Sequence, residues 1–426
     1  MGEGVLIAGF PRVAGALRCE GVPLDDIADT AGTPSYVYSA ATIRNRYELL
    51  SEALAGVPHR IHYTLKANSC RAILQLLREL GAGADVVSGG ELFRARRAGF
   101  AASDIIFGGV GKTAEELREA LEANVLLINV ESEQEIALVD RLAGERGIVA
   151  PVSVRVNPEI TVDAGHEYIR TGERGQKFGV PFDDALRVAE GAASLPHVRL
   201  VGLDMHLGSQ LARIEPYRVG TERLAGIARG LRARGVDSLR YLDIGGGLGV
   251  RYDDEQPPDL DRFARSVLPL VEATGLELIM EPGRFVVGNA GALLTRVLYR
   301  KHSGGKDYVI ADAGMTELLR PSHYGAFHRI EAVHGGPPRK RVDVVGPVCE
   351  SGDFLALDRE IADVAPGDLL AVFDVGAYGF VMASNYNSRR RGAEVLVDGD
   401  RFAIVTEREQ YDTLVQQEVE DPVWRS

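Results

Sequence analysis

Between residues 61 and 284, short apolar runs rich in β-branched residues alternate with stretches of helical period. This alternation restricts the possible folds more than any other feature of the sequence. The predicted strands cover residues 61–65, 84–87, 104–108, 125–130, 151–156, 199–206, 239–244 and 276–281. Each is followed by a segment that can carry a helix, such as 71–80 or 91–99, as in the βα units of a parallel sheet. Parallel strands connected in this way close most naturally into a (β/α)8 TIM barrel, so we predict an α/β fold.

The chain outside this region is predicted to be β structure. After residue 290 the pattern changes to short alternating runs at 293–300, 306–311, 341–345, 369–374, 393–397 and 401–406. The first 40 residues carry no clear helical period, and residues 35–38 are predicted to form a strand leading into the barrel. We therefore expect a barrel over 37–285 and an all-β domain from 1–36 and 286–426. The irregular segment 157–178 is expected to be a mobile lid.

Composition and charge restrict the partners of this chain. The 61 acidic and 48 basic residues give a net charge of −13, which repels phosphate backbones and anionic lipid, so neither nucleic acid nor a membrane is expected as a partner. The cysteines Cys19, Cys70 and Cys349 show no metal-binding or disulfide spacing, which favours the reducing cytoplasm. No apolar run reaches the length of a membrane span.

Polar residues cluster at the C-terminal ends of the predicted strands, where barrel enzymes carry their catalytic groups. They are Lys66, Asp85, Ser88, Asn129, Glu131, Arg155, Asn157, His206, the glycines 245–247 and the segment from Glu281 to Arg284. Lys66 is the most informative of them. An amine partly desolvated at such a strand end has a lowered pKa and can attack a carbonyl, as a Schiff-base lysine does, although a random lysine is more often a solvated surface group.

The glycine run and Glu281 indicate what such a lysine could serve. Glycines directly after the seventh strand can expose backbone N–H groups to a phosphate, and Arg284 adds a cation able to pair with a phosphate or a carboxylate. A carboxylate at the position of Glu281 can hold a pyridinium nitrogen protonated. We expect no metal, because His206 has no carboxylate or cysteine at ligand spacing. The Walker-like Gly111-Lys112-Thr113 and the dinucleotide-like 245–247 run both lack a required glycine.

Several motifs, in order along the chain, resemble those of a known enzyme family. They are Tyr63-Thr64-Leu65-Lys66-Ala67-Asn68, Asp85-Val86-Val87-Ser88-Gly89-Gly90-Glu91, His206-Leu207-Gly208-Ser209-Gln210, Gly245-Gly246-Gly247-Leu248-Gly249 and Glu281-Pro282-Gly283-Arg284. Together they resemble the fold-type III pyridoxal-phosphate decarboxylases. The downstream motifs Asp312-Ala313-Gly314-Met315, Arg320-Pro321, Cys349-Glu350-Ser351-Gly352-Asp353 and Gly376-Ala377-Tyr378-Gly379 narrow the resemblance to the diaminopimelate decarboxylases.

The resemblance implies an alanine-racemase-like architecture, in which a Greek-key barrel-like β domain accompanies the (β/α)8 barrel. It also implies pyridoxal 5'-phosphate as cofactor, decarboxylation of meso-2,6-diaminopimelate to L-lysine, and a homodimer. Lys66 would form the Schiff base with the cofactor, and Cys349 would protonate the carbanion left by CO2. Both Cys349 and Glu350 would reach the site from the other subunit, so active sites would be shared.

The resemblance assigns the remaining contacts residue by residue. The cofactor would be contacted by Lys66, Asp85, His206, Ser209, Gly246, Gly247, Glu281, Pro282, Gly283, Arg284 and Tyr378. The substrate would be contacted by Arg284, Arg320, Tyr324, Glu350 and Tyr378. His206 would stack on the ring and Glu281 would contact its nitrogen. The two arginines and Tyr324 would bind the distal carboxylate, and Glu350 the distal amino group.

Plainer roles stay open for some of these residues. Cys349 could be a small buried cysteine, and Arg320 and Tyr324 could be surface neighbours on a helical turn. Asp85 and Ser88 could cap the helix that begins near Gly89.

The resemblance also leaves the exact substrate open. The chain departs from the family pattern at Gly165, Arg170 and Arg390, and Arg170 could alter substrate entry. The alternatives are a decarboxylase of another basic amino acid or related metabolite, an amino-acid racemase and a non-catalytic cofactor-binding protein.

Overall fold

The computed structural model describes residues 9–162, 166, 168, 170–336 and 339–425. The chain divides into two compact units. One is formed by residues 43–288, and the other combines residues 1–42 with 289–426. Gly165, one of the departures from the family pattern, lies outside the described residues.

The first unit is a closed parallel barrel, as predicted. Its strands, in chain order, are β5 (His59–Thr64), β6 (Gly83–Val86), β7 (Ile105–Phe107), β8 (Leu127–Val130), β9 (Ala150–Asn157), β11 (Val198–Asp204), β12 (Tyr241–Asp243) and β13 (Glu277–Met280). Each strand pairs in parallel with its neighbours, and the pairings of β13 with β5 and of β8 with β9 close the ring. The short strand β10 (Val180–Pro181) adds to the edge of β9.

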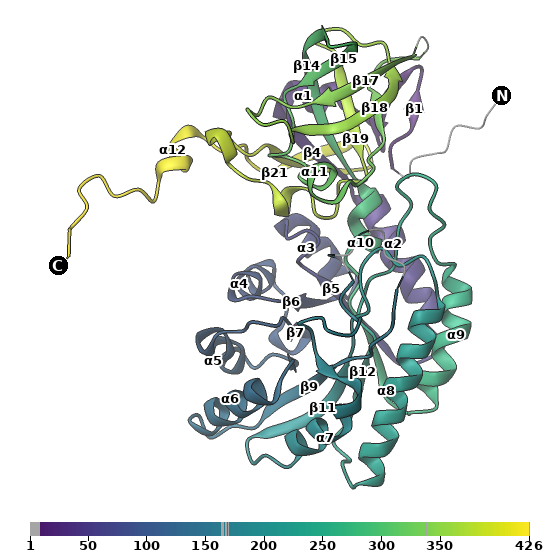
Figure 1. The fold of residues 1–426 in the computed structure, drawn as a ribbon, viewed down its shortest axis with the longest axis vertical. Helices are drawn as coiled ribbons and strands as arrows, with labels where there is room; N and C mark the ends of the chain where they lie inside the picture. Colours follow the sequence, from purple (N-terminus) through teal and green to yellow (C-terminus); the bar gives the residue numbers. More distant parts are fainter. Residues whose placement is uncertain (1–8, 163–165, 167, 169, 337–338, 426) are drawn as a thin grey trace. The chain divides into compact units, whose positions relative to one another are not determined.

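Helices cover the outside of the barrel (Figure 1). They are α2 (Ala40–Leu54), α3 (Arg71–Glu79), α4 (Gly89–Ala98), α5 (Ala114–Ala123), α6 (Glu133–Gly144), α7 (Phe182–Ala193), α8 (Glu215–Ala233), α9 (Leu260–Glu272) and the short α10 (Arg284–Val287). Several begin at side-chain caps, such as the capping box of Thr113 and Glu116 at α5. The interior is filled by side chains, because Ile106, Leu127, Val201, Tyr241 and Ile279 from different strands form one buried cluster.

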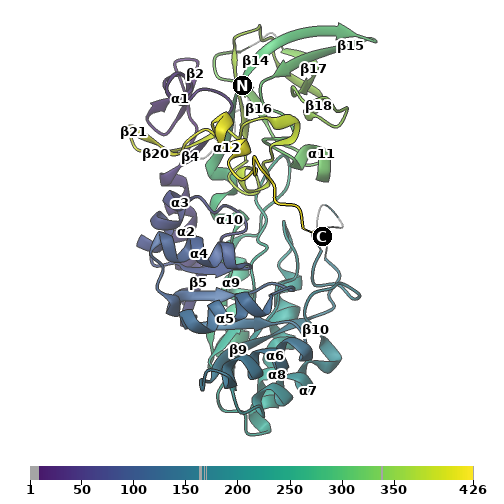
Figure 2. The ribbon, with the colours of Figure 1, turned by 90° about the vertical axis from the view of Figure 1, so that its left-hand side faces the viewer.

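The second unit is mostly sheet. Its strands are β1 (Arg12–Val13), β2 (Ala16–Cys19), β3 (Val22–Pro23), β4 (Ser35–Ser39), β14 (Gly291–Ser303), β15 (Lys306–Ala311), β16 (Ile330–Ala332), β17 (Arg339–Val345), β18 (Phe354–Ala362), β19 (Leu369–Phe373), β20 (Ala393–Asp398) and β21 (Arg401–Thr406). The long strand β14 pairs with β4, β15 and β19 and so organises the sheet. Figure 2 shows β14 and β15 running side by side, joined through Gly304 and Gly305, which both have positive φ.

Three local predictions for this unit were incomplete. The helix α1 (Leu24–Ala31) lies in the region where no helical period was expected, although its buried Leu24, Ile27 and Ala28 follow that period. The strand predicted at 35–38 forms as β4 and precedes α2 of the barrel, but its pairing with β14 and β20 inside the sheet unit was not predicted. The edge strand β18 was missed because exposed charged residues interrupt its alternation at Asp358.

Two short helices complete the second unit, α11 (Arg320–Tyr324) and α12 (Tyr411–Val415). Among the residues that the structure describes, no helix combines the length and the apolar character required to cross a bilayer.

Candidate active site

The loops that follow the barrel strands bring the predicted polar residues to one end of the barrel. Lys66 lies two residues beyond the end of β5, and its charge acts directly on the carboxyl group of Asp85 on β6. The lysine is exposed in this chain. Lys66 stands beyond the buried part of its strand, and the partial desolvation expected for its amine stays a prediction.

Asp85 is buried, with 4% of its surface exposed. Burial raises the pKa of this carboxyl group, and the neighbouring Lys66 works in the opposite direction. Ser88, not Asp85, caps the following helix, since the Ser88 side chain accepts a hydrogen bond from the backbone N–H of Glu91 at 3.2 Å. The capping role considered for Ser88 is confirmed, and Asp85 is left facing the lysine.

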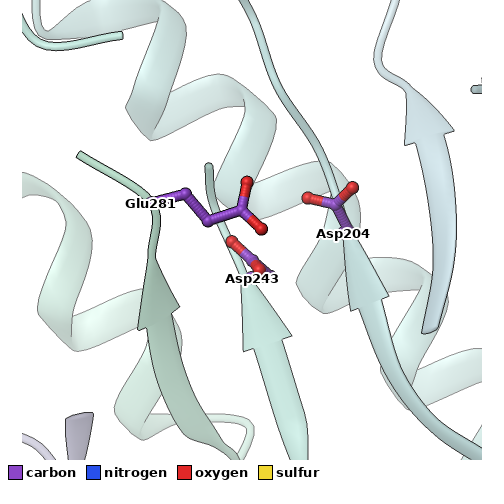
Figure 3. Close-up of side chains that lie close together, drawn as sticks. All are labelled: Asp204, Asp243 and Glu281. Carbon is purple, nitrogen blue, oxygen red and sulfur yellow. The ribbon is translucent and has the colours of Figure 1, made fainter. Parts of the chain in front are cut away.

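Three carboxyl groups meet at the ends of adjacent strands (Figure 3). Asp204 ends β11, Asp243 ends β12 and Glu281 follows β13, and a carboxylate oxygen of each lies within 4.8 Å of the others. Burial raises the pKa of Asp204 and of Glu281 well above the usual carboxyl range, and each is raised further by the Asp243 charge. Burial also raises the pKa of Asp243, to about 7.

Arg155 is the main cation beside these acids. Its Nη1 lies 2.7 Å from Glu131 Oε1, and its Nε lies 3.8 Å from Asp204 Oδ2. Asp204 and Asp243 were not among the predicted site residues. The signal that would have found them is a charged residue as the last position of an otherwise apolar strand, because such a carboxyl group points into the mouth of the barrel.

His206, which follows β11, accepts a hydrogen bond at Nδ1 from the backbone N–H of Gly246 at 3.3 Å. Burial, and then the charges of Lys66 and Arg155, hold the pKa of this imidazole well below its usual value. A neutral ring with an accepting Nδ1 is consistent with both effects. The structure therefore presents His206 as an uncharged aromatic surface at the barrel mouth.

The glycine run differs from its prediction in one respect. The N–H groups of Gly245 and Gly246 are not offered outward, because they donate to Asp243 Oδ1 and His206 Nδ1. Glycine is required here for close packing. A Cβ on Gly246 would lie 2.1 Å from the carbonyl oxygen of Glu281, and Gly247 has a φ of +90°.

Arg284 and Ser209 are brought together as predicted. The guanidinium group donates from Nη2 to Ser209 Oγ at 3.0 Å and from Nη1 to the Tyr252 hydroxyl at 2.5 Å. Arg284 is 6% exposed. The preceding turn packs tightly on the lysine loop, since a Cβ on Gly283 would lie 2.8 Å from Ala67 Cβ, and Pro282 accepts from the N–H of Thr64.

In the sheet unit, Arg320 is buried rather than a surface neighbour on a helical turn. It is 7% exposed, and its Nη1 lies 2.8 Å from Nε2 of the fully buried His328. His328 Nδ1 in turn lies 2.8 Å from the carbonyl oxygen of Phe373. Because guanidinium only donates, this network assigns His328 as neutral with its proton on Nδ1. Nothing in the sequence around His328 signalled this role.

The loop that carries Cys349 and Glu350 is exposed, so the prediction of a small buried cysteine is wrong. Buried Asp353 anchors the loop by accepting from the N–H groups of Val348 and Met315, each at 2.6 Å. Asn387 Oδ1 accepts from the N–H of Cys349 at 3.0 Å. The predicted motif residues 349–353 are therefore held against the loop of 312–315.

Two further predicted residues lie in the same unit. Tyr324 ends α11 and contacts the ring of His323, with the ring centroids 4.5 Å apart. Tyr378 has a positive φ of 59° in the turn after β19. A non-glycine residue in this conformation needs support from its surroundings and is frequent at functional sites.

The remaining departures from the family pattern are also located. Arg170 forms an isolated bridge with Gly208, directly before Ser209, and Arg390 stacks on the ring of Tyr411 at 4.5 Å. The contact of Arg170 places it beside the His206–Ser209 segment.

Comparison with known proteins defines the class of this barrel. Residues 40–288 match the family model described as the pyridoxal-binding domain of pyridoxal-dependent decarboxylases. The fold and its strand-end residues thus define a fold-type III pyridoxal-phosphate enzyme. The diaminopimelate decarboxylase of Pseudomonas aeruginosa is 49% identical over 92% of this chain and 94% of its own length.

Solved structures agree over most of the chain. Diaminopimelate decarboxylase from Helicobacter pylori in complex with L-lysine has a TM-score of 0.89 at 40% identity and covers 93% of this chain and 99% of its own. The corresponding L-lysine complex from M. jannaschii has a TM-score of 0.92 at 35% identity, covering 98% and 99%. The chain belongs to the diaminopimelate decarboxylases.

Proposed function

We propose that this chain removes CO2 from meso-2,6-diaminopimelate and releases L-lysine, with pyridoxal 5'-phosphate as cofactor. The observation that carries the proposal is the L-lysine bound in two relatives that match this chain over 93% and 98% of its length. L-Lysine is the product expected when one carboxyl group is lost from the substrate.

The barrel residues fit this cofactor. Arg284 and Ser209, joined at 3.0 Å, offer a cation and a hydroxyl group to a phosphate, and Gly247 leaves backbone space where a Cβ would collide. The neutral His206 can stack on the ring, and Glu281 can hold the ring nitrogen. Asp85, Gly246, Pro282 and Gly283 shape the same surface, and Tyr378 is assigned to it from the sheet unit.

Each protein group has a separate task in the reaction. When bound, pyridoxal phosphate supplies the electron sink that accepts the pair left by departing CO2. Lys66 provides the amine that holds the cofactor and later displaces the product. Asp85 beside Lys66 keeps that amine charge-balanced, and Glu281 stabilises positive charge at the ring nitrogen.

Substrate recognition is assigned to residues of the sheet unit together with Arg284. Arg320 and Arg284 bind the distal carboxylate with Tyr324, and Glu350 binds the distal amino group. Buried Arg320 is suited to this task because neutral His328 orients it without cancelling its charge. Cys349 returns a proton to the α-carbon after CO2 has left, from an exposed loop fixed by Asn387 and Asp353.

The same proposal includes a homodimer in which Cys349 and Glu350 serve the partner's barrel. Exposure of both residues on one chain supports this assignment. Cys19, Cys70 and Cys349 form no disulfide bond in the part of the chain that the structure describes, which favours a cytoplasmic location. The net charge of −13 makes nucleic acid an unfavourable partner.

A substrate panel tests the proposal directly. Purified protein with pyridoxal phosphate is incubated separately with meso-, LL- and DD-diaminopimelate, L-lysine, L-ornithine and L-arginine, and released CO2 and amine products are measured. We expect CO2 and stoichiometric L-lysine from the meso isomer alone. Faster turnover of ornithine or lysine would assign the chain to another decarboxylase activity, and racemisation without CO2 would exclude decarboxylation.

A further inference from the structure

The two aspartates next to Glu281, Asp204 and Asp243, each have a buried carboxylate oxygen without a hydrogen-bond donor among the described residues. Asp204 and Asp243 are each 2% exposed. Asp243 Oδ1 accepts from the N–H of Gly245 at 2.8 Å, but Asp243 Oδ2 and Asp204 Oδ1 are buried and have no hydrogen-bond donor among the described residues. An ionised carboxylate with such an oxygen is strongly disfavoured in the interior.

The charged groups around the three acids do not provide a cation that pairs with Asp243. Beyond their effects on one another, the three acids are acted on by the ionisable groups of Asp85, Glu131 and Arg155 from neighbouring strand ends. Lys66 acts on Asp85. Arg155 forms its ion pairs with Glu131 and Asp204. Within the described part of the chain, neither Asp243 nor Glu281 has an ion pair with a cation.

The Glu281 side chain reaches from the end of β13 across the end of β12, so that its carboxyl group lies above that of Asp243 (Figure 3). Two carboxyl groups in this arrangement repel each other if both are ionised, and share a proton if one is not. The proton would also satisfy the orphaned Asp243 Oδ2.

We propose that Asp243 is a positioning residue for Glu281: one proton shared between Asp243 Oδ2 and the Glu281 carboxyl group holds Glu281 in its place over β12. The inference rests on the proposed function only for the task of Glu281 at the cofactor ring. The shared proton is a property of the protein without cofactor. It limits the pair to one negative charge and fixes the side-chain rotamer before the cofactor binds.

The variant Asp243→Asn distinguishes the effect of the shared proton from the effect of a hydrogen bond that holds Glu281 in place. Its amide can still accept from Gly245 and can donate to Glu281, so the geometry is kept while the shared proton is lost. Asp243→Leu removes both. Asp204→Asn is the matched control, because it replaces a neighbouring buried acid by an amide but leaves the Asp243–Glu281 pair intact.

The test is infrared spectroscopy of the full-length protein without cofactor at neutral pH, in which a protonated carboxyl group has its own C=O stretching band. Other buried acids with a raised pKa, such as Asp204 and Glu91, contribute to the same spectral region, so the band of the pair is read from wild-type-minus-variant difference spectra. We expect Asp243→Asn and Glu281→Gln to remove the same band, and Asp204→Asn to leave that band in place. Persistence of the band in Asp243→Asn, or its loss only in Asp204→Asn, would place the proton elsewhere and overturn the proposal.

Cofactor affinity supplies a second readout. Asp243→Leu should weaken pyridoxal-phosphate binding about tenfold or more, whereas Asp243→Asn should weaken it much less, with circular dichroism showing that both fold. Equal losses in the two variants would contradict positioning. Stabilisation of the wild type by added Mg²⁺ or Mn²⁺, abolished by Asp243→Asn, would identify a cation site and also overturn the proposal. The infrared result does not depend on turnover, so it is distinguishable from failure of the decarboxylase assignment.

Discussion

Arg320 Nη1 lies 2.8 Å from His328 Nε2, and this contact holds a buried cation against a neutral imidazole. A neutral imidazole orients the guanidinium group without cancelling its charge. Removing it should affect the distal end of the substrate and spare the cofactor.

We expect Arg320→Ala to raise KM for diaminopimelate by about ten- to a hundredfold, since a hydrogen bond to a charged group is worth about 1.5–3 kcal/mol. Steady-state kinetics and cofactor titration measure the two effects separately. Arg341→Ala is the control, because Arg341 forms only exposed ion pairs. An unchanged KM for diaminopimelate together with loss of the cofactor would show that Arg320 binds the cofactor and not the distal carboxylate of the substrate.

Arg284 should show the opposite behaviour, with its main effect on cofactor binding. Loss of the guanidinium group in Arg284→Gln leaves Ser209 and Tyr252 without their shared donor and removes the cation for the phosphate. We expect cofactor affinity to fall by about tenfold or more, with a smaller fall in Ser209→Ala. Fluorescence titration with pyridoxal phosphate checks this order, and a larger effect of the serine variant would refute it.

The buried acids predict a pH dependence of stability for the protein without cofactor. The folded-state pKa of Asp243 is raised to about 7, so the folded chain binds a proton that the unfolded chain has already released. Stability is then fully present below a pH of about 4 for this group, and is lost as pH rises through about 7. Asp243→Asn should flatten this slope in urea titrations at several pH values. An identical slope in wild type and variant would contradict the raised pKa.

Subunit sharing can be tested by complementation. Lys66→Ala and Cys349→Ala are each expected to be nearly inactive, and mixing them under conditions of subunit exchange should restore up to about a quarter of the sites. That fraction follows because a mixed dimer has one site with both residues and one with neither. If mass spectrometry detects mixed dimers but activity stays absent, each site draws both residues from one chain.

The sequence predicted the barrel well because each βα unit leaves a local signal. Strand β5 was expected at 61–65 and forms at 59–64, and the strand at 276–281 forms as β13 at 277–280. Buried parallel strands are continuous apolar runs, so their pattern does not depend on distant partners. The edge strand β18 gave no such signal, because exposed charged residues interrupt its apolar pattern. Its strand conformation depends on pairing with β17.

The candidate site was predicted in part for the same reason. Residues that follow apolar strands, such as Lys66 and Arg284, are visible from position alone. The partners that tune them are not, because His328 contacts Arg320 only after β16 and β19 have paired, and Asp243 meets Glu281 only when β12 and β13 lie in register. Likewise, the occupied N–H groups of Gly245 and Gly246 depend on side chains from other strand ends.

We propose that pyridoxal phosphate is held at the C-terminal end of the barrel by a covalent bond to Lys66. The most direct measurement is reduction of the cofactor-loaded protein with borohydride, followed by digestion and peptide mass spectrometry. We predict one phosphopyridoxyl group per chain, attached to Lys66, and none on the buried Lys112, whose amine is engaged with Glu135 and two carbonyl groups. A modification on any other lysine, with Lys66 unmodified, would contradict the account.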